Sequence, residues 1–174
     1  MERRDVIRWA GPQGQIRSLS PALSPPKLGV VPGGRATSLE ELPERVQSLL
    51  DTERRAVMTT ISRDGSAHSV PVVFARVEDE IISPIDHKPK TGEILKRVKN
   101  IGRDDRVTLL VDHWDEEWER LVWLMIRGRA RIDAEAPLSL MLELNRRYSQ
   151  YEPDERHDAL IRITPVRLSW WSWT

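Results

Sequence analysis

The feature that most constrains the fold is a run of β-type segments separated by tight turns. Residues 56–63 are rich in β-branched side chains, and Asp64-Gly65 follows as a two-residue hairpin turn whose positions must both accept positive φ. A return strand is predicted over residues 66–76 and a third strand over residues 80–85. Because these segments are joined by short connections, they favour an antiparallel sheet or barrel over a parallel sheet.

The rest of the chain adds three strands and two or three helices. Strands are predicted over residues 106–114, 121–133 and 159–171, and Gly128 is the expected bulge in the second of these. The helices are predicted after the start pattern at residues 37–41, with an apolar stripe of Leu42, Val46, Leu49 and Leu50, then over residues 93–101, and from Pro137 to Tyr148. The expected fold is mainly β, a six-stranded antiparallel barrel with flanking helices.

The composition divides the chain and limits its function. Residues 1–36 are rich in proline and glycine and are predicted to be a flexible extension, and residues 37–174 to be one domain. Acidic and basic residues balance at 27 each, so no overall field favours nucleic acid or an anionic membrane. Cysteine is absent and no apolar run approaches the ~20 residues of a membrane span, so a soluble, cytoplasmic protein is expected.

One corner of the predicted barrel is suited to hold an anion. Lys88 and Lys90 flank Pro89 after the third strand, and Lys96 and Arg97 follow on the helix that begins near residue 91. Backbone N–H groups at a helix start and nearby cations both favour a phosphate group. The alternative is a solvated basic surface. The four histidines have no zinc-type spacing, so no metal site is predicted.

Tryptophan is concentrated in the last third of the chain. Six of the seven tryptophans lie at or after Trp114, and three of them lie within residues 170–173. Because tryptophan is enriched among buried interface residues, a homodimer is predicted, with core packing as the alternative explanation.

Several stretches, in this order and spacing, resemble a known family. They are residues 59–74 (TTISRDGSAHSVPVVF), 86–90 (DHKPK), 104–112 (DDRVTLLVD), the acidic loop with Trp118, 122–130 (VWLMIRGRA) and 167–170 (RLSW). Together they resemble the pyridoxamine 5′-phosphate oxidase-like split-barrel proteins, and in particular the branch that uses the deazaflavin coenzyme F-420. The likeness covers roughly residues 40–174.

The resemblance implies a six-stranded split barrel that dimerises, with a flavin or deazaflavin in the groove between subunits. In such proteins the ring lies along the second and third strands, which here points to Val70, Pro71, Val72, Ile82, Ser83 and Pro84, largely through their backbone groups. The phosphate meets the loop after the third strand, which selects Lys88 and Lys90, with Lys96 and Arg97 as lesser candidates.

The implied activity is hydride transfer between coenzyme F-420 and an unidentified small organic substrate, with no catalytic residue identified. Cations spread from Lys88 to Lys99 suit the longer acidic tail of coenzyme F-420. Two alternatives stay open. One is an FMN-dependent enzyme resembling pyridoxamine-phosphate oxidases, for which the sequence offers only Arg127, Arg129 and Arg131 as a substrate-phosphate site. The other is a cofactor-carrying or haem-binding protein without turnover, with His68, His87 or His113 as haem candidates.

Overall fold

The computed structural model describes residues 33–85, 94–151 and 159–173. The chain divides into two units, Met1–Val31 and Pro32–Thr174, and the first lies outside the described residues. For residues 1–32 of the predicted flexible extension, which ran over residues 1–36, the prediction therefore lies outside the described residues. In the described ranges, no helix has the length and apolar character that crossing a membrane requires.

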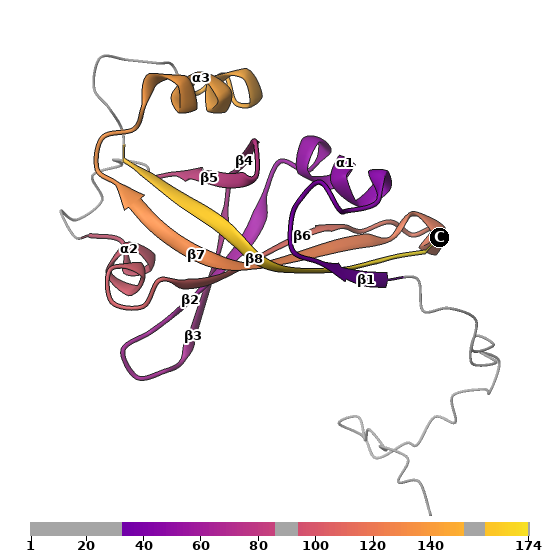
Figure 1. Cartoon of the computed structure of the whole chain (residues 1–174), viewed down its shortest axis with the longest axis horizontal. Coiled ribbons are helices and arrows are strands. Elements are labelled where there is room, and N and C mark those ends of the chain that lie inside the picture. Colours follow the sequence, from indigo (N-terminus) through magenta and orange to yellow (C-terminus); the bar gives the residue numbers. More distant parts are fainter. Residues whose placement is uncertain (1–32, 86–93, 152–158, 174) are drawn as a thin grey trace, which may run out of the picture. The chain divides into compact units, whose positions relative to one another are not determined.

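The second unit is built on one antiparallel sheet (Figure 1). Its described strands are β1 (Gly33–Ala36), β2 (Ala56–Ile61), β3 (Ala67–Val72), β4 (Ala75–Val77), β5 (Glu80–Pro84), β6 (Arg106–His113), β7 (Val122–Asp133) and β8 (Leu160–Ser172). They follow the order β3-β2-β6-β7-β8-β5-β4, and β1 also pairs with β8. The sheet is not closed, since β3 and β4 end its path. The predicted mainly β, antiparallel split-barrel fold is thus confirmed.

Helices cover the sheet and close its core. They are α1 (Glu44–Thr52), α2 (Lys96–Ile101) and α3 (Leu138–Arg147), with a short 3-10 helix, η1 (Trp118–Arg120). The predicted apolar stripe of α1 is confirmed, because Val46, Leu49 and Leu50 are all buried. One hydrophobic cluster fills the barrel, and a second packs beneath α3.

The strand number differs from the six predicted because the return strand is broken and an earlier strand is added. Residues 66–76 do not form one strand: β3 ends at Val72 and β4 begins at Ala75. The two halves pair with different partners, β2 and β5. Between them Phe74 is fully buried, and its backbone N–H and carbonyl meet the Tyr148 hydroxyl at 3.3 and 2.8 Å instead of a strand.

The added strand, β1, lies where a flexible extension was predicted. Gly33 and Gly34 pair with Trp171 and Trp170. A Cβ on Gly34 would lie 2.4 Å from Cζ2 of Trp170, so the strand can approach β8 only because this residue has no side chain. The glycines at residues 33–34 therefore mark a close contact, and the sequence signal for flexibility was wrong for residues 33–36.

The hairpin between β2 and β3 has a longer turn than predicted. Ile61 pairs with Ala67, and the Ser62 N–H donates to the Ser66 carbonyl at 2.8 Å, so the turn has three residues. Gly65 has φ of 82°, and Asp64 does not share that conformation. This is a turn followed by a left-handed glycine, the usual three-residue solution, and it needs positive φ at one position only.

A bulge lies beside Gly128, but its extra residue is on β8 and not on β7, the strand in which the bulge was predicted. The β7–β8 register shifts between Arg127 and Gly128, and Val166 is the extra residue on β8. A Cβ on Gly128 would lie 2.5 Å from the Thr164 carbonyl oxygen, which explains the glycine.

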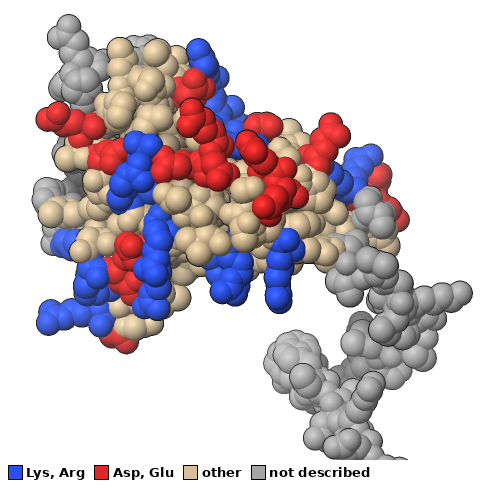
Figure 2. Space-filling view, in the orientation of Figure 1, with Lys and Arg blue, Asp and Glu red and all other residues tan. Residues whose placement is uncertain are grey.

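Charge is balanced overall but not locally. Figure 2 shows acidic side chains in a band across the middle of this face and most basic side chains along its lower edge. Local fields can therefore bind ions although the net charge is zero.

Candidate functional site

A pocket of about 220 Å³ lies between β3, at one end of the sheet path, and β5, the last strand but one at the other end. It is lined by Arg55, Pro71, Val72, Val73, Pro84, Arg97 and Tyr151. These residues come from the end of β3, the break after it, the end of β5 and the start of α2, with Arg55 just before β2 and Tyr151 after α3. Segments distant in sequence thus form one concave site.

The pocket exists because both ladders stop beside it. β3 is an edge strand with β2 on one side only, and Pro71 has no N–H to donate. The pairing of β4 with β5 ends at Ile82, one residue before Ser83. Edge strands expose unpaired backbone donors and acceptors, so this corner can hydrogen-bond a ligand through its backbone.

The pocket combines an apolar wall with positive charge. Pro71, Val72 and Pro84 supply apolar surface, and Arg55 and Arg97 supply two guanidinium groups. None of the described lining residues carries a negative charge. Arg55 is exposed, whereas Arg97 is partly buried. Such a set fits a ligand with a flat apolar part and an anionic part.

The structure brings together four of the ten residues predicted from the resemblance. Pro71, Val72, Pro84 and Arg97 all line the pocket. Lys88 and Lys90 belong to the segment between Ile85 and Ile94, which lies outside the described residues.

The other four predicted residues do not line the pocket. Val70 packs against the core cluster, and Lys96 is exposed on α2. Ile82 and Ser83 are 0% and 1% exposed, so in this chain only their backbone could reach a ligand. The Ser83 Oγ is buried and has no hydrogen-bond partner among the described residues.

Sequence reasoning missed Arg55, Val73 and Tyr151. For Arg55 the signal lay in the strand register: Ala56 pairs with Val72, so the residue before Ala56 lies beside the residue after Val72. Tyr151 gave no local signal, because it follows α3 and reaches the pocket only through tertiary packing.

The described histidines lie elsewhere. His68 is on β3, but it does not line the pocket. His113 ends β6, where its Nδ1 lies 2.8 Å from a carboxylate oxygen of Glu53. His87 lies outside the described residues.

Comparisons with known proteins agree on the family. Residues 42–172 match the family described as pyridoxamine 5′-phosphate oxidase. Among proteins of curated function, no sequence matches the chain.

Solved structures share the fold at low sequence identity. A conserved hypothetical protein from Mycobacterium tuberculosis is 22% identical with a TM-score of 0.59, over 72% of this chain and 81% of that one. An F420 reductase is 23% identical with a TM-score of 0.56, over 73% of this chain and 98% of that one. A haem storage protein from Vibrio cholerae is 12% identical with a TM-score of 0.55, over 68% and 86%. These likenesses establish the fold alone, and the match over residues 42–172 places this chain in the pyridoxamine 5′-phosphate oxidase family.

Proposed function

We propose that the protein binds coenzyme F-420 at the pocket lined by Pro71 and Pro84 and acts as an oxidoreductase on a small organic substrate. The observation that carries this proposal is the meeting of Pro71, Val72, Pro84 and Arg97 in one pocket. The resemblance selects these four residues from three separate segments of the sequence. The likeness to an F420 reductase, in fold, supports the same choice.

The proposed roles follow the two halves of the pocket. The strand ends at residues 70–72 and 82–84 would face the cofactor ring, chiefly through backbone groups and the two prolines. Lys88 and Lys90 would hold the phosphate, assisted by Arg97 and, from the structure, by Arg55. Guanidinium groups suit this role because they donate two parallel hydrogen bonds to an oxyanion.

The cofactor, when bound, supplies the hydride chemistry, and the protein's part is to orient the substrate and exclude water. FMN is the alternative cofactor, because its single phosphate could use the same cations. A haem site has less support, since neither His68 nor His113 lines the pocket.

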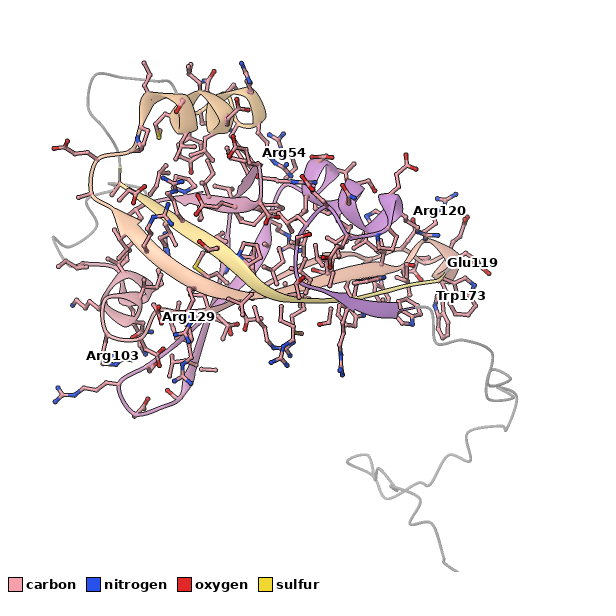
Figure 3. All side chains as sticks on the ribbon, in the orientation of Figure 1. Arg54, Arg103, Glu119, Arg120, Arg129 and Trp173 are labelled. Carbon is pink, nitrogen blue, oxygen red and sulfur yellow. The ribbon has the colours of Figure 1, made fainter. Side chains whose placement is uncertain are left out.

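The size of the pocket supports a second subunit. At about 220 Å³ it is smaller than the ~300–1,000 Å³ of typical ligand sites, so one chain would hold only part of the cofactor. We propose that a homodimer completes the site. Trp114 and Trp118 are 71% and 53% exposed, and Trp173, shown in Figure 3 at the β6–β7 end of the sheet, is 37% exposed. Side chains of this kind are favoured at protein interfaces.

The test is a titration of the purified full chain with coenzyme F-420, FMN and haem, followed by fluorescence or absorbance. Coenzyme F-420 is expected to bind most tightly, and equal or tighter FMN binding would refute the preference. The Lys88→Ala, Lys90→Ala double variant is expected to lose about tenfold or more in F-420 affinity, roughly the effect of one charge-assisted hydrogen bond.

A charge-matched control is available on the surface. Arg120→Ala with Arg146→Ala also removes two cations, whose side chains are 61% and 72% exposed and paired only at the surface. This control is expected to bind F-420 like the parent. An unchanged affinity in a folded Lys88, Lys90 variant would instead assign these lysines to a solvated surface.

A further inference from the structure

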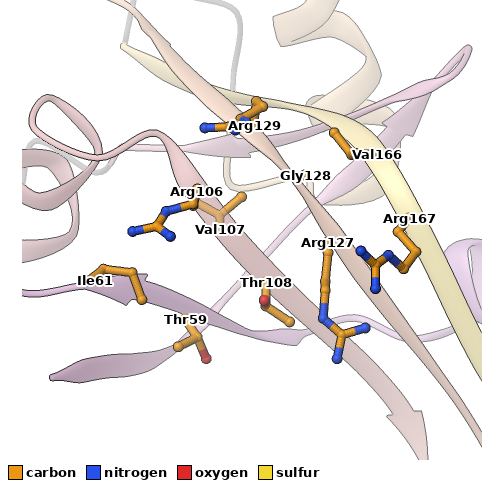
Figure 4. Close-up of a pocket in the computed structure, with 10 residues that line it drawn as sticks. All are labelled: Thr59, Ile61, Arg106, Val107, Thr108, Arg127, Gly128, Arg129, Val166 and Arg167. Atoms are coloured by element: carbon orange, nitrogen blue, oxygen red, sulfur yellow. The ribbon is translucent and has the colours of Figure 1, made fainter. Parts of the chain in front are cut away.

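A second hollow lies on the outward face of the sheet and is rich in arginine. It has a volume of about 300 Å³ and opens over β2, β6, β7 and β8 (Figure 4). Four arginines line it: Arg106, Arg127, Arg129 and Arg167. It shares no lining residue with the pocket at Pro71 and Pro84, so it is a separate feature.

Strand register arranges hydrogen-bond donors in one row across this face. Ser69 pairs with Thr59, Thr59 with Thr108, Thr108 with Arg127, and Arg127 with Arg167. Neighbouring strands are about 4.8 Å apart, so three hydroxyl groups lead in regular steps to two guanidinium groups. The Thr59 and Ser69 hydroxyls are 2.9 Å apart. Arg127 and Arg167, at one end of the row, are the only charged residues among these five.

Two of the four arginines are already neutralised. Arg106 donates to both carboxylate oxygens of Asp104, at 2.9 and 2.6 Å. Arg129 donates to Asp105 at 2.5 Å. These pairs hold their guanidinium groups at the rim of the hollow and leave them little attraction for another anion.

Arg127 and Arg167 differ from these two. Among the described residues, neither has an ion-pair or hydrogen-bond partner, and both are exposed. They lie directly opposite each other on β7 and β8, and Figure 4 shows both side chains at the same side of the hollow. Like charges opposite each other destabilise a sheet, and an anion between them would relieve that cost. The arrangement is thus poised to accept one.

Apolar surface adjoins this cationic pair. The next outward-facing row contains Val57, Leu110 and Met125, which pair in register and are each partly buried. Two residues along an antiparallel strand span about 7 Å, so this row lies about 7 Å from the row that contains Arg127. One aromatic ring or a short alkyl chain can span that distance. A ligand anchored at Arg127 could rest its apolar body on Leu110 and Met125.

We propose that Arg127 and Arg167 form a clamp for a small organic anion, a carboxylate or a phosphate monoester, whose apolar body lies on Leu110 and Met125. Both head groups match the paired N–H donors of a guanidinium. The Thr108 hydroxyl, next to Arg127 in the row, supplies a further donor. This proposal does not depend on the cofactor, because the two sites share no lining residue.

The test is calorimetric titration of the cofactor-free full chain with phenyl phosphate, benzoate and inorganic phosphate. Phenyl phosphate or benzoate is expected to bind, and the tighter of the two identifies the head group. The Arg127→Gln, Arg167→Gln double variant should weaken this binding about tenfold or more, because each charged hydrogen bond contributes at least that factor. The Arg120→Gln, Arg146→Gln double variant, with the same charge change on exposed residues, should bind like the parent.

The other results overturn the proposal in distinct ways. If the parent and the Arg127, Arg167 variant bind phenyl phosphate or benzoate equally well, the clamp is refuted. If the control variant loses as much affinity, the effect is one of general charge and the clamp is also refuted. Inorganic phosphate binding as tightly as phenyl phosphate removes the apolar contact. If the double variant fails to fold, Arg167→Lys takes its place, because lysine keeps the positive charge and lacks the paired N–H donors of a guanidinium. Weaker benzoate binding by this variant supports the clamp, and unchanged binding refutes it.

Discussion

Glu80 joins three strands behind the candidate site, and its replacement offers a sharp test of the fold. Its carboxylate accepts hydrogen bonds from Arg162 Nε at 3.0 Å, Arg131 Nη1 at 2.9 Å and Thr164 Oγ1 at 3.1 Å. Glu80 begins β5, while these partners lie on β7 and β8. The network therefore fixes the strand that leads to Pro84.

The expected loss of unfolding free energy depends on how exposed each hydrogen-bond partner of Glu80 is. Glu80 and Arg162 side chains are both 24% exposed, so their bonds are partly shielded from water, whereas Arg131 is 49% exposed and contributes less. Removing one partner of a charged hydrogen bond costs about 1.5–3 kcal/mol. Arg162 keeps Asp133 at 3.3 Å, which limits the loss. Glu80→Gln should therefore lower the unfolding free energy at neutral pH by about 2 kcal/mol.

The loss should depend on pH in a defined direction. Burial raises the pKa of Glu80, but hydrogen bonds from Arg162, Arg131 and Thr164 outweigh it and the pKa is lowered overall. A carboxylate with a lowered pKa in the folded protein stabilises it above the ordinary pKa, and that stabilisation is lost as pH falls through the folded value. The difference between parent and variant should thus shrink toward acid.

The assay is urea unfolding followed by tryptophan fluorescence, at about pH 7 and about pH 3. Glu116→Gln is the control: it removes an exposed carboxylate that has no ion pair among the described residues, and it should leave stability unchanged. A loss below about 0.5 kcal/mol at neutral pH, or a loss of equal size at both pH values, would refute the reasoning.

Two further substitutions, one of them with a matched glycine control, test backbone contacts. Gly128→Ala should destabilise the protein by about 1–3 kcal/mol in the same urea assay, because the added Cβ would lie 2.5 Å from the Thr164 carbonyl oxygen. Gly102→Ala is the control: Gly102 has φ of −62° and its added Cβ would lie 3.6 Å from the nearest atom, so this variant should be as stable as the parent or more stable. Tyr148→Phe should cost about 1–2 kcal/mol, because the buried Phe74 N–H loses its acceptor; an unchanged urea midpoint would show that the broken strand does not need this hydroxyl.

Much of the fold could be read from local pattern. Apolar spacing predicted the buried stripe of α1, and Gly128 indicated where a bulge lies, although the extra residue, Val166, is on the neighbouring strand β8. The stripe is a local signal, because it depends on one face of one helix. The turn at Asp64-Gly65 was placed correctly but its length was not, since the register of β2 and β3 sets the number of turn residues.

The candidate site was predicted only in part. The resemblance selected Pro71, Val72, Pro84 and Arg97, which meet in one pocket. It also selected Ile82, largely for its backbone groups, and the side chain of Ile82 is fully buried. Strand alternation cannot say which face of β5 turns inward when both faces are covered, as here by the main core and by the cluster under α3. Arg55 was missed because its place depends on pairing across the hairpin.

The sequence by itself determined the mainly β character and the places of β2, β5, β6, β7 and β8, because these follow from periodicity and turn residues along the chain. The tertiary structure alone decided which charges remain uncompensated. Arg129 and Arg131 have carboxylate partners, Asp105 and Glu80, far away in sequence, while Arg127 faces Arg167. Whether an arginine has a carboxylate partner depends on which strands become neighbours, and the positions of the arginines in the sequence do not predict that pairing.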